Sequence, residues 1–232
     1  MALIGEAGVM GSIADMFEKI MGWMPALLQA SWTTLSLTVV SVCAALIISV
    51  FLALGKISKN VVLSKACSAY VFFFRGTPLL MQLFFIYYAL PQISPALTIQ
   101  SRFIAALLAF TLNIAAYLAE IIRAAIQSID KGQMEASKAL GLTYAQAMRL
   151  VVIPQAYRRM IPPICNEFVM VLKDTSIVFV VGLMDLTSQT RKIQSSNATA
   201  LVFIPAMAMY LIMTGVFTAI FNRLEEKLSA YE

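Results

Sequence analysis

The stretch LLQASWTTLSLTVVSVCAALIISVFLAL, residues 27–54, decides the class of the fold. It lies within a longer run, between Lys19 and Lys56, that contains no charged residue. Because a bilayer core about 30 Å thick requires roughly 20 apolar residues in a helix, this stretch predicts a transmembrane helix. The whole chain has the same character, since 60% of its 232 residues are hydrophobic and only 12% are charged. A soluble domain carries about 25% charged residues, so the excess apolar surface of this chain must face lipid.

Four further spans are predicted along the chain. A short interfacial helix at 59–74 is expected before the second span, 76–90, which begins at Thr77-Pro78 and ends before Pro91. The remaining spans are predicted at 102–127, 160–182 and 199–222. We therefore expect an all-α, polytopic membrane protein with about five transmembrane helices.

Basic residues are distributed unequally between the two ends of these spans. Twelve of the lysines and arginines lie in the connections 55–75 and 123–159 and after residue 222, whereas four lie in the segments on the opposite side. Cytoplasmic loops carry the excess of basic residues. The distribution predicts an N-terminus outside and a C-terminal tail, 223–232, in the cytoplasm. It also accounts for the net charge of +5 without a nucleic-acid partner.

Residues 1–26 are expected to form a separate extracytoplasmic, amphipathic segment. Ser12 followed by Asp15 is a capping pattern, and apolar residues recur at helical spacing as far as Met24. We expect a helix at 12–24 on the outer membrane interface, with a contact to an extracellular partner as the alternative. No cleaved signal peptide is recognisable, so the first span is expected to act as its own insertion signal.

Composition excludes several kinds of chemistry. The chain has no histidine, which rules out histidine metal sites and histidine-dependent catalytic triads, and we predict neither catalytic nor metal-binding residues. Cys43, Cys67 and Cys165 form no close pair in the sequence and are expected to be small buried apolar residues. No Gly-x4-Gly-Lys-Ser/Thr phosphate loop occurs, so the chain holds no ATP of its own.

Residues 128–160 form the only long polar connection. Its pattern predicts two short helices that meet at a glycine-centred bend on the cytoplasmic face. The caps and breaks that define them are Asp130 with Gln133, Gly141, Thr143 with Gln146, Pro154 and Pro162-Pro163. The prolines are expected to end the second helix and to begin the span at 160. A simple loop would not need consecutive caps, so we interpret the segment as a docking element.

Several motifs in the chain are shared with a known family. They are Glu135-Ala136-Ser137 with Gly141 and Ile153-Pro154, Arg75-Gly76-Thr77-Pro78-Leu79-Leu80 with Gln82, Tyr117-Leu118-Ala119-Glu120-Ile121-Ile122-Arg123, and Lys173-Asp174-Thr175-Ser176. On these motifs residues 27–222 resemble the permease subunits of bacterial ABC importers for polar amino acids, of the histidine, glutamine and arginine type. The first motif resembles the EAA loop of those permeases, with Ser137 where alanine is usual.

The resemblance implies a pore subunit that couples ATP hydrolysis in a partner to alternating access. It implies ABC ATPase subunits that hold the ATP and magnesium, a second permease subunit, identical or paralogous, and an extracytoplasmic amino-acid-binding protein. It also implies location in the bacterial cytoplasmic (inner) membrane, and no enzymatic activity in this chain. The coupling helix that would enter the ATPase comprises Glu135, Ala136, Ser137, Leu140 and Gly141. For Glu135 the alternative is a solvated helix face.

Ionisable residues within a membrane are functional candidates, because each costs about 2.5–3.5 kcal/mol to insert. Glu167 and Asp174 are seven residues apart and share a helix face. The substrate-binding candidates are Asn166, Glu167, Lys173 and Asp174, with Thr77 and Gln82 as weaker ones. In the resembled family an Asn-Glu pair at 166–167 favours basic amino acids. The alternative is purely structural, with Lys173 paired to Asp174 or Glu120.

Two other charged groups have local interpretations. Glu120 and Arg123 are expected to form a local ion pair or a gate element, and Arg75 is expected to anchor at the interface. Two other kinds of protein remain as alternatives for the whole chain. A secondary amino-acid transporter typically shows internal repeats and more spans, neither of which is visible here. A non-transporting structural subunit would need neither the capped helices nor intramembrane carboxylates.

Overall fold

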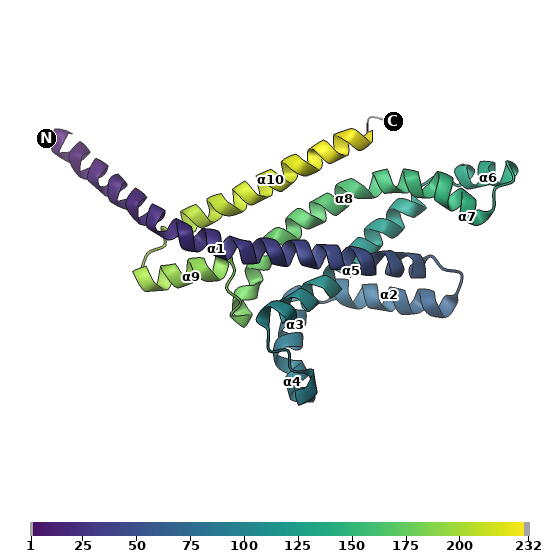
Figure 1. Ribbon diagram of the computed structural model, residues 1–232, viewed down its shortest axis with the longest axis horizontal. Helices are drawn as coiled ribbons and strands as arrows, with labels where there is room; N and C mark the ends of the chain where they lie inside the picture. The colour runs from purple at the N-terminus through teal and green to yellow at the C-terminus, as the bar shows by residue number, and fades with distance from the viewer. Residues whose placement is uncertain (1, 230–232) are drawn as a thin grey trace.

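The computed structural model describes residues 2–229, with side chains described for 15–227, and within that part of the chain all regular structure is helical. This confirms the predicted all-α class. The longer helices are α1 (Ala2–Lys56), α2 (Val61–Gly76), α5 (Arg102–Gln127), α8 (Ile153–Asp174), α9 (Leu186–Asn197) and α10 (Phe203–Ser229). The shorter ones are α3 (Leu79–Phe84), α4 (Leu90–Ile93), α6 (Lys131–Ala139) and α7 (Tyr144–Ala147). Figure 1 shows α6 and α7 at the opposite end of the molecule from α9.

Three helices are long and apolar enough to cross a membrane, namely α1, α5 and α10. The pair formed by α2 and the segment Leu79–Ile93 is bent by 101° and makes a fourth span if the two parts are taken together. Helix α8, the fourth span of the sequence prediction, is not among them; it carries Glu167, Lys173 and Asp174. The count of five spans stays a prediction.

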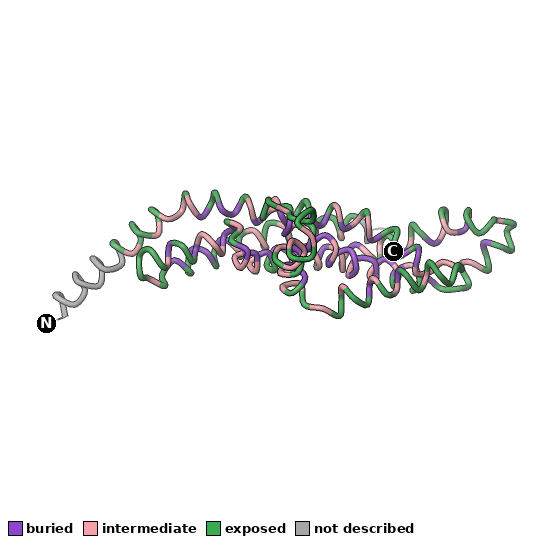
Figure 2. Tube along the Cα trace, turned by 90° about the horizontal axis from the view of Figure 1, so that it is seen from below, coloured by how far each residue is buried: buried purple, intermediate pink, exposed green. Residues whose placement is uncertain are grey.

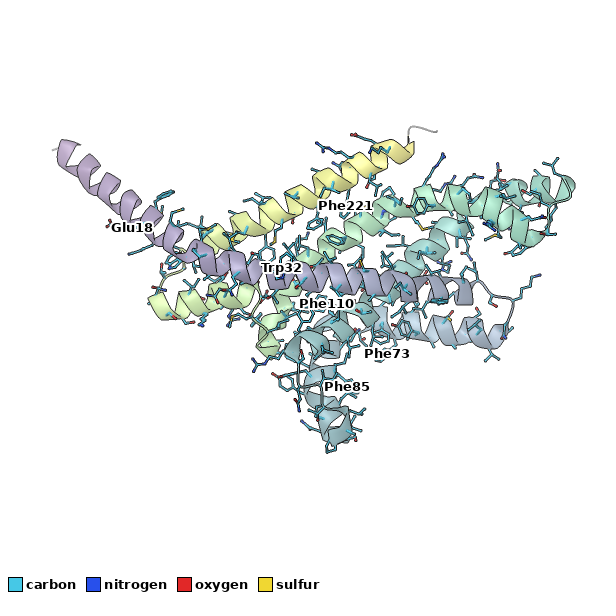
Figure 3. The ribbon with its side chains drawn as sticks, viewed as in Figure 1. Glu18, Trp32, Phe73, Phe85, Phe110 and Phe221 are labelled. Atoms are coloured by element: carbon cyan, nitrogen blue, oxygen red, sulfur yellow. The ribbon has the colours of Figure 1, made fainter. Side chains whose placement is uncertain are left out.

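Helix α1 is continuous from Ala2 to Lys56, so the predicted separate helix at 12–24 is wrong. Ser12 lies within the helix and cannot cap it, and its side chain is outside the described ones. Figure 3 shows α1 changing direction between the labelled Glu18 and Trp32, an interval that contains Pro25. Proline removes a backbone hydrogen bond and clashes with the preceding turn, which accounts for a bend without a break.

The core of the bundle is helix α5 packed against α1. One face of α5 is lined with alanines that are completely buried, among them Ala105, Ala109 and Ala116, and small side chains allow helix backbones to approach closely. On α1 several buried hydroxyls bond to their own helix; Thr38, for example, donates to the carbonyl of Thr34 at 2.9 Å. Figure 2 shows the buried residues along the inside of the bundle and the exposed ones on its outer faces.

The cysteines only partly follow the sequence prediction. Cys67 and Cys165 are buried, as expected, and form no disulfide. Cys43 is exposed on α1, so the expectation of burial was wrong for this residue. Its position on the outside of a membrane-spanning helix explains the difference, because an apolar environment is available there without burial in protein.

The second predicted span is broken rather than straight. Asn60 caps α2 by accepting from the amides of Val62 and Leu63, which confirms a helix close to 59–74. After the bend the helical path continues through α3 and a π turn, Phe85–Ala89, to α4, and ends at Ile93. Pro91 therefore does not stop it, although proline donates no backbone hydrogen bond; the π turn lies just before it, where the regular helical bonding is interrupted. The labelled Phe85, which is 50% exposed, lies in the π turn between α3 and α4 (Figure 3).

The path from α7 into α8 is also continuous, contrary to the sequence prediction. A π turn, Met148–Val152, joins α7 to α8, and Pro162 and Pro163 lie inside α8. Prolines are tolerated within membrane helices because neighbouring groups satisfy the freed backbone atoms. The chain is thus helical without interruption from Tyr144 to Asp174, and a 3-10 helix, η4 (Thr175–Val181), follows it.

Helix α9 was not predicted. Asp185 begins it by accepting from the amides of Ser188, at 2.8 Å, and Thr187, at 3.1 Å. Gly182, with φ of +73°, turns the chain before it. The amide of Leu186 donates to the hydroxyl of Thr34 on α1 at 3.1 Å, which fixes α9 against the bundle.

Candidate functional site

The polar connection folds into a helical hairpin of α6 and α7 with the predicted caps. Asp130 begins α6, although its carboxylate accepts from the amide of Gly132, at 2.6 Å, rather than from that of Gln133. Thr143 and Gln146 form the predicted capping box, each side chain bonded to the amide of the other. Gly141 makes the bend with φ of +81°, a conformation that other residues adopt only with strain.

The hairpin is anchored to α5 and α8. Ala125, Ile129, Val152 and Ala156 form a buried apolar cluster beneath it, against which Met134, Met148 and Met160 pack. Arg159 on α8 donates to the carbonyl of Ser128 at 2.6 Å and to its hydroxyl at 3.0 Å. The hairpin is therefore a packed element and not a slack loop.

Most of the predicted coupling residues lie on the surface of the hairpin. Glu135, Ala136 and Gly141 are exposed, and Leu140 is 83% exposed. Ser137 is the exception, because it is only 4% exposed and its hydroxyl bonds to the carbonyl of Gln133; it supports α6 from inside. Tyr144 is 62% exposed beside them. Sequence reasoning missed this residue, although an aromatic side chain directly after the Thr143 cap was a usable signal.

Glu120 and Arg123 form the predicted ion pair, with Arg123 Nη2 2.7 Å from Glu120 Oε2. Sequence reasoning missed a third member, Lys56, which pairs with the other carboxylate oxygen. Lys56 ends α1 and Glu120 lies on α5, so the pair joins two helices. The role of the cluster as a gate stays a prediction.

Helix α8 carries the candidate substrate residues with unpaired side chains. Asn166, Lys173 and Asp174 are exposed and Glu167 is half-buried. Within residues 15–227 none of the four forms a side-chain hydrogen bond or ion pair. The structural alternative, Lys173 paired with Asp174 or Glu120, is therefore not formed. Glu120 is instead occupied by Lys56 and Arg123.

The two weaker candidates, Thr77 and Gln82, hold the bend between α2 and α3. Gln82 is 6% exposed, and its amide nitrogen lies 2.8 Å from the hydroxyl of Thr77 and 3.0 Å from the carbonyl of Phe74. Its amide oxygen accepts from Asn113 of α5 at 3.1 Å. This geometry favours a structural role, and a contact with substrate stays a prediction for both residues.

A cleft of about 400 Å³ lies between α2 and α5. It is lined by Lys56, Ser68, Val71, Phe72, Arg75, Gly76, Tyr117 and Glu120. The guanidinium carbon of Arg75 lies 5.2 Å from the centroid of the Tyr117 ring. Arg75 therefore faces a charged cleft at the bend of the second span.

The sequence family described as binding-protein-dependent transport system inner membrane component matches residues 45–230 of this chain. The chain belongs to this family. Among the relatives of this permease, PatM of Vibrio harveyi, a probable amino-acid ABC transporter permease protein, is 42% identical over 200 residues, 86% of this chain and 89% of PatM. The glutamine transport system permease protein GlnP of Escherichia coli K12 is 36% identical over 206 residues, 88% of this chain and 94% of GlnP.

A solved structure agrees with the sequence relatives. The permease is similar to a chain in the crystal structure of an amino acid ABC transporter with histidines, with a TM-score of 0.86 and 39% identity. The match covers 91% of this permease and 98% of that chain. The resemblance inferred from the motifs is thus confirmed, and the permease is an inner membrane component with membrane-spanning helices.

Proposed function

We propose that this permease forms one half of the transmembrane pathway of an ATP-driven importer for polar amino acids. The observation that carries the proposal is the packed, doubly capped α6–α7 hairpin, which exposes Glu135, Leu140 and Tyr144 at one end of a chain without a phosphate loop (Figure 1). Force from ATP hydrolysis must then enter from another polypeptide, and this hairpin is the surface built to receive it.

The assembly that follows from this proposal contains three further kinds of subunit. ABC ATPase subunits, with their ATP and magnesium, dock on the hairpins. A second permease subunit, identical or paralogous, completes the pathway, and an extracytoplasmic binding protein delivers the amino acid. In this arrangement the hairpin and the C-terminus lie in the cytoplasm and the N-terminus lies outside, as the basic residues predict.

Transmission through the permease has a direct structural route. The path from Tyr144 to Asp174 is helical throughout and contains no loop. A movement of the hairpin is therefore transmitted along α8 to Glu167 and Asp174. Packed helices respond to such displacements by moving between discrete arrangements, which is the physical basis of alternating access. The permease itself performs no covalent chemistry in this mechanism.

The substrate class is a basic amino acid. Among the residues whose side chains are described, no cation lies within ion-pair distance of the two carboxylates Glu167 and Asp174 on α8. A charged group in a membrane requires compensation. The ammonium group and a cationic side chain supply it, with Asn166 and Lys173 as further polar contacts. The similar solved transporter is one with histidines, whereas GlnP is named for glutamine, so both kinds of substrate belong in the test.

The coupling role is tested with Glu135→Ala, and with Glu18→Ala as the control, an exposed glutamate at the other end of the molecule. In proteoliposomes with the ATPase and binding protein, we expect Glu135→Ala to lose uptake and ATPase association while its membrane insertion stays normal. Unchanged ATP-dependent uptake would reject the docking role. A secondary transporter would continue to transport without the ATPase, and a structural subunit would not transport in either case.

A further inference from the structure

Helix α9 presents a cationic face at the opposite end of the molecule from the α6–α7 hairpin (Figure 1). The exposed residues of this helix are all polar: Arg191, Lys192, Ser195, Ser196 and Asn197. No acidic residue occurs between Asp185 and Glu225, and Asp185 is buried as the N-cap of α9. The charge of this face is therefore not balanced by the segment that carries it.

The side of the membrane on which these cations lie gives them significance. With the hairpin in the cytoplasm, as proposed above, α9 lies on the outer side, whereas basic residues concentrate on the cytoplasmic side. Arg102, another basic residue of the outer segments, is used within the permease, because it donates to the carbonyl of Gly182 at 3.1 Å. Two adjacent cations on the exposed face of α9 need a different explanation.

Arg191 and Lys192 are available to an anionic partner. Within residues 15–227 neither side chain forms a salt bridge or a hydrogen bond. The guanidinium carbon of Arg191 lies 4.3 Å from the centroid of the Phe179 ring, which holds the planar group in place while its N–H groups stay free to donate. An oriented guanidinium without an anion is suited to a carboxylate on another protein.

The cationic face is carried on a rigid base. The amide of Leu186 donates to the hydroxyl of Thr34 at 3.1 Å, and the hydroxyl of Thr187 lies 3.0 Å from that of Tyr210 on α10. Beneath them lies a buried apolar cluster formed by Leu27, Leu186, Ile193, Val202 and Met209. A surface that is ordered before binding loses little conformational entropy when a partner docks.

A cavity of about 240 Å³ between α1 and the start of α9 argues against lipid as the cover of this surface. It is lined by Ala26, Gln29, Ala30, Thr33, Met184 and Gln189. The side-chain amides of Gln29 and Gln189 form no hydrogen bond to any described residue, and lipid tails offer none. Gln189 and Lys192 are three residues apart and share a helix face, so the cavity continues into the cationic face. Whatever covers this surface must supply hydrogen-bonding groups, as a protein does.

We propose that the exposed face of α9, with Arg191 and Lys192 at its centre, is the surface on which the extracytoplasmic amino-acid-binding protein docks with an acidic patch. This inference rests on the proposed function and names the part of the permease that receives the binding protein. Opposite charges accelerate the encounter of two proteins and fix their register. The 3-10 helix η4 joins the end of α8 to the segment before α9, so docking is felt by the span that carries Asp174.

The test uses the permease–ATPase complex in nanodiscs, together with the binding protein that supports ATP-dependent uptake by the parent. The affinity and association rate of the amino-acid-loaded binding protein are measured at low and at high salt, in nanodiscs with and without phosphatidylglycerol. The charge-removing variant combines Arg191→Gln with Lys192→Gln, and the charge-retaining variant combines Arg191→Lys with Lys192→Arg. Lys19→Gln is the control, at an exposed lysine of the outer part of α1. Size-exclusion profiles and basal ATPase activity check assembly.

We expect the charge-removing variant to bind the binding protein about three- to tenfold more weakly at low salt, because each exposed ion pair contributes little. Its association should be slower, and its difference from the parent should shrink at high salt, where surface charges are screened. The charge-retaining variant should keep most of the affinity, and Lys19→Gln should match the parent. Basal ATPase activity should be the same in all variants.

The proposal is overturned if the charge-removing variant binds like the parent or if Lys19→Gln is weakened equally. It is also overturned if the loss occurs only in nanodiscs with phosphatidylglycerol, which would assign the cations to lipid headgroups, or if the variant fails to assemble, which would assign them a structural role. Loss of uptake in Glu135→Ala, together with unchanged binding in the α9 variant, would reject this inference while leaving the proposed function intact.

Discussion

Arg159 on α8 donates a hydrogen bond of 2.6 Å to the backbone carbonyl of Ser128, just beyond the end of α5. The bond joins the two helices at the base of the α6–α7 hairpin. Arg159 is exposed, so its contribution to stability is modest, but it fixes the angle at which the hairpin meets the bundle. A movement of the hairpin can therefore reach α5 and α8 together.

Arg159→Ala should loosen the hairpin without unfolding the permease. Loss of this hydrogen bond is expected to lower local stability by about 1 kcal/mol and to reduce uptake several-fold, while ATPase association is retained. Hydrogen exchange of residues 128–150 measures the first effect and proteoliposome uptake the second. Arg149→Ala, at an exposed arginine in the π turn, is the control and should change neither. Normal exchange in Arg159→Ala would show that the apolar cluster alone holds the hairpin.

Gly141→Ala should destabilise the bend. Alanine at φ of +81° is expected to cost about 1 kcal/mol, because its Cβ clashes with its own backbone in the left-handed region. A matched control exists in Gly215→Ala on α10, where a Cβ has nothing within 4 Å and φ is not positive. Thermal unfolding and uptake are compared for both. If Gly141→Ala and Gly215→Ala had the same melting temperature and the same uptake, the bend would tolerate alanine at position 141, and the prediction would be wrong.

Glu167→Gln and Asp174→Asn should reduce uptake of a basic amino acid without affecting assembly. Each substitution removes one of the two unpaired carboxylates on the face of α8, and a charge-assisted contact of this kind contributes about 1.5–3 kcal/mol. Uptake and substrate-stimulated ATPase activity are measured with L-arginine in competition with other amino acids. If both variants match the parent across the competitors, α8 has a structural role only.

Asn113→Ala should destabilise the bend between α2 and α3 but leave substrate preference unchanged. Asn113 is 7% exposed and donates to Gln82 at 3.1 Å and to the carbonyl of Phe74 at 3.0 Å. Removing it leaves buried polar groups unsatisfied, which costs about 1–3 kcal/mol. The melting temperature measures the loss, with exposed Gln92→Ala as the control. A change of substrate preference at unchanged stability would instead support the pore-lining prediction for Gln82.

Sequence patterns predicted the structure correctly where that structure depends only on residues nearby in the chain. Caps at Asp130 and Thr143 and the bend at Gly141 require only side chains and backbone within a few residues. The predictions for the prolines were wrong for a related reason. Pro91, Pro154 and Pro162 are locally unfavourable in helices, but π turns precede Pro91 and Pro154, and Pro162 lies inside α8, where neighbouring groups can satisfy the freed backbone atoms. The prediction that Ser12 caps a helix was wrong because Ser12 lies inside the longer helix α1.

By itself the sequence determined that the chain is helical, lies in a membrane, presents a capped hairpin and contains no phosphate loop. Each of these follows from composition, spacing or a local motif. Only the tertiary structure decided which charges are satisfied: Lys56 and Arg123 pair with Glu120, whereas Glu167 and Asp174 form no ion pair among the described residues. Pairing depends on distances between helices far apart in the sequence, and those distances are set by packing against the alanine face of α5.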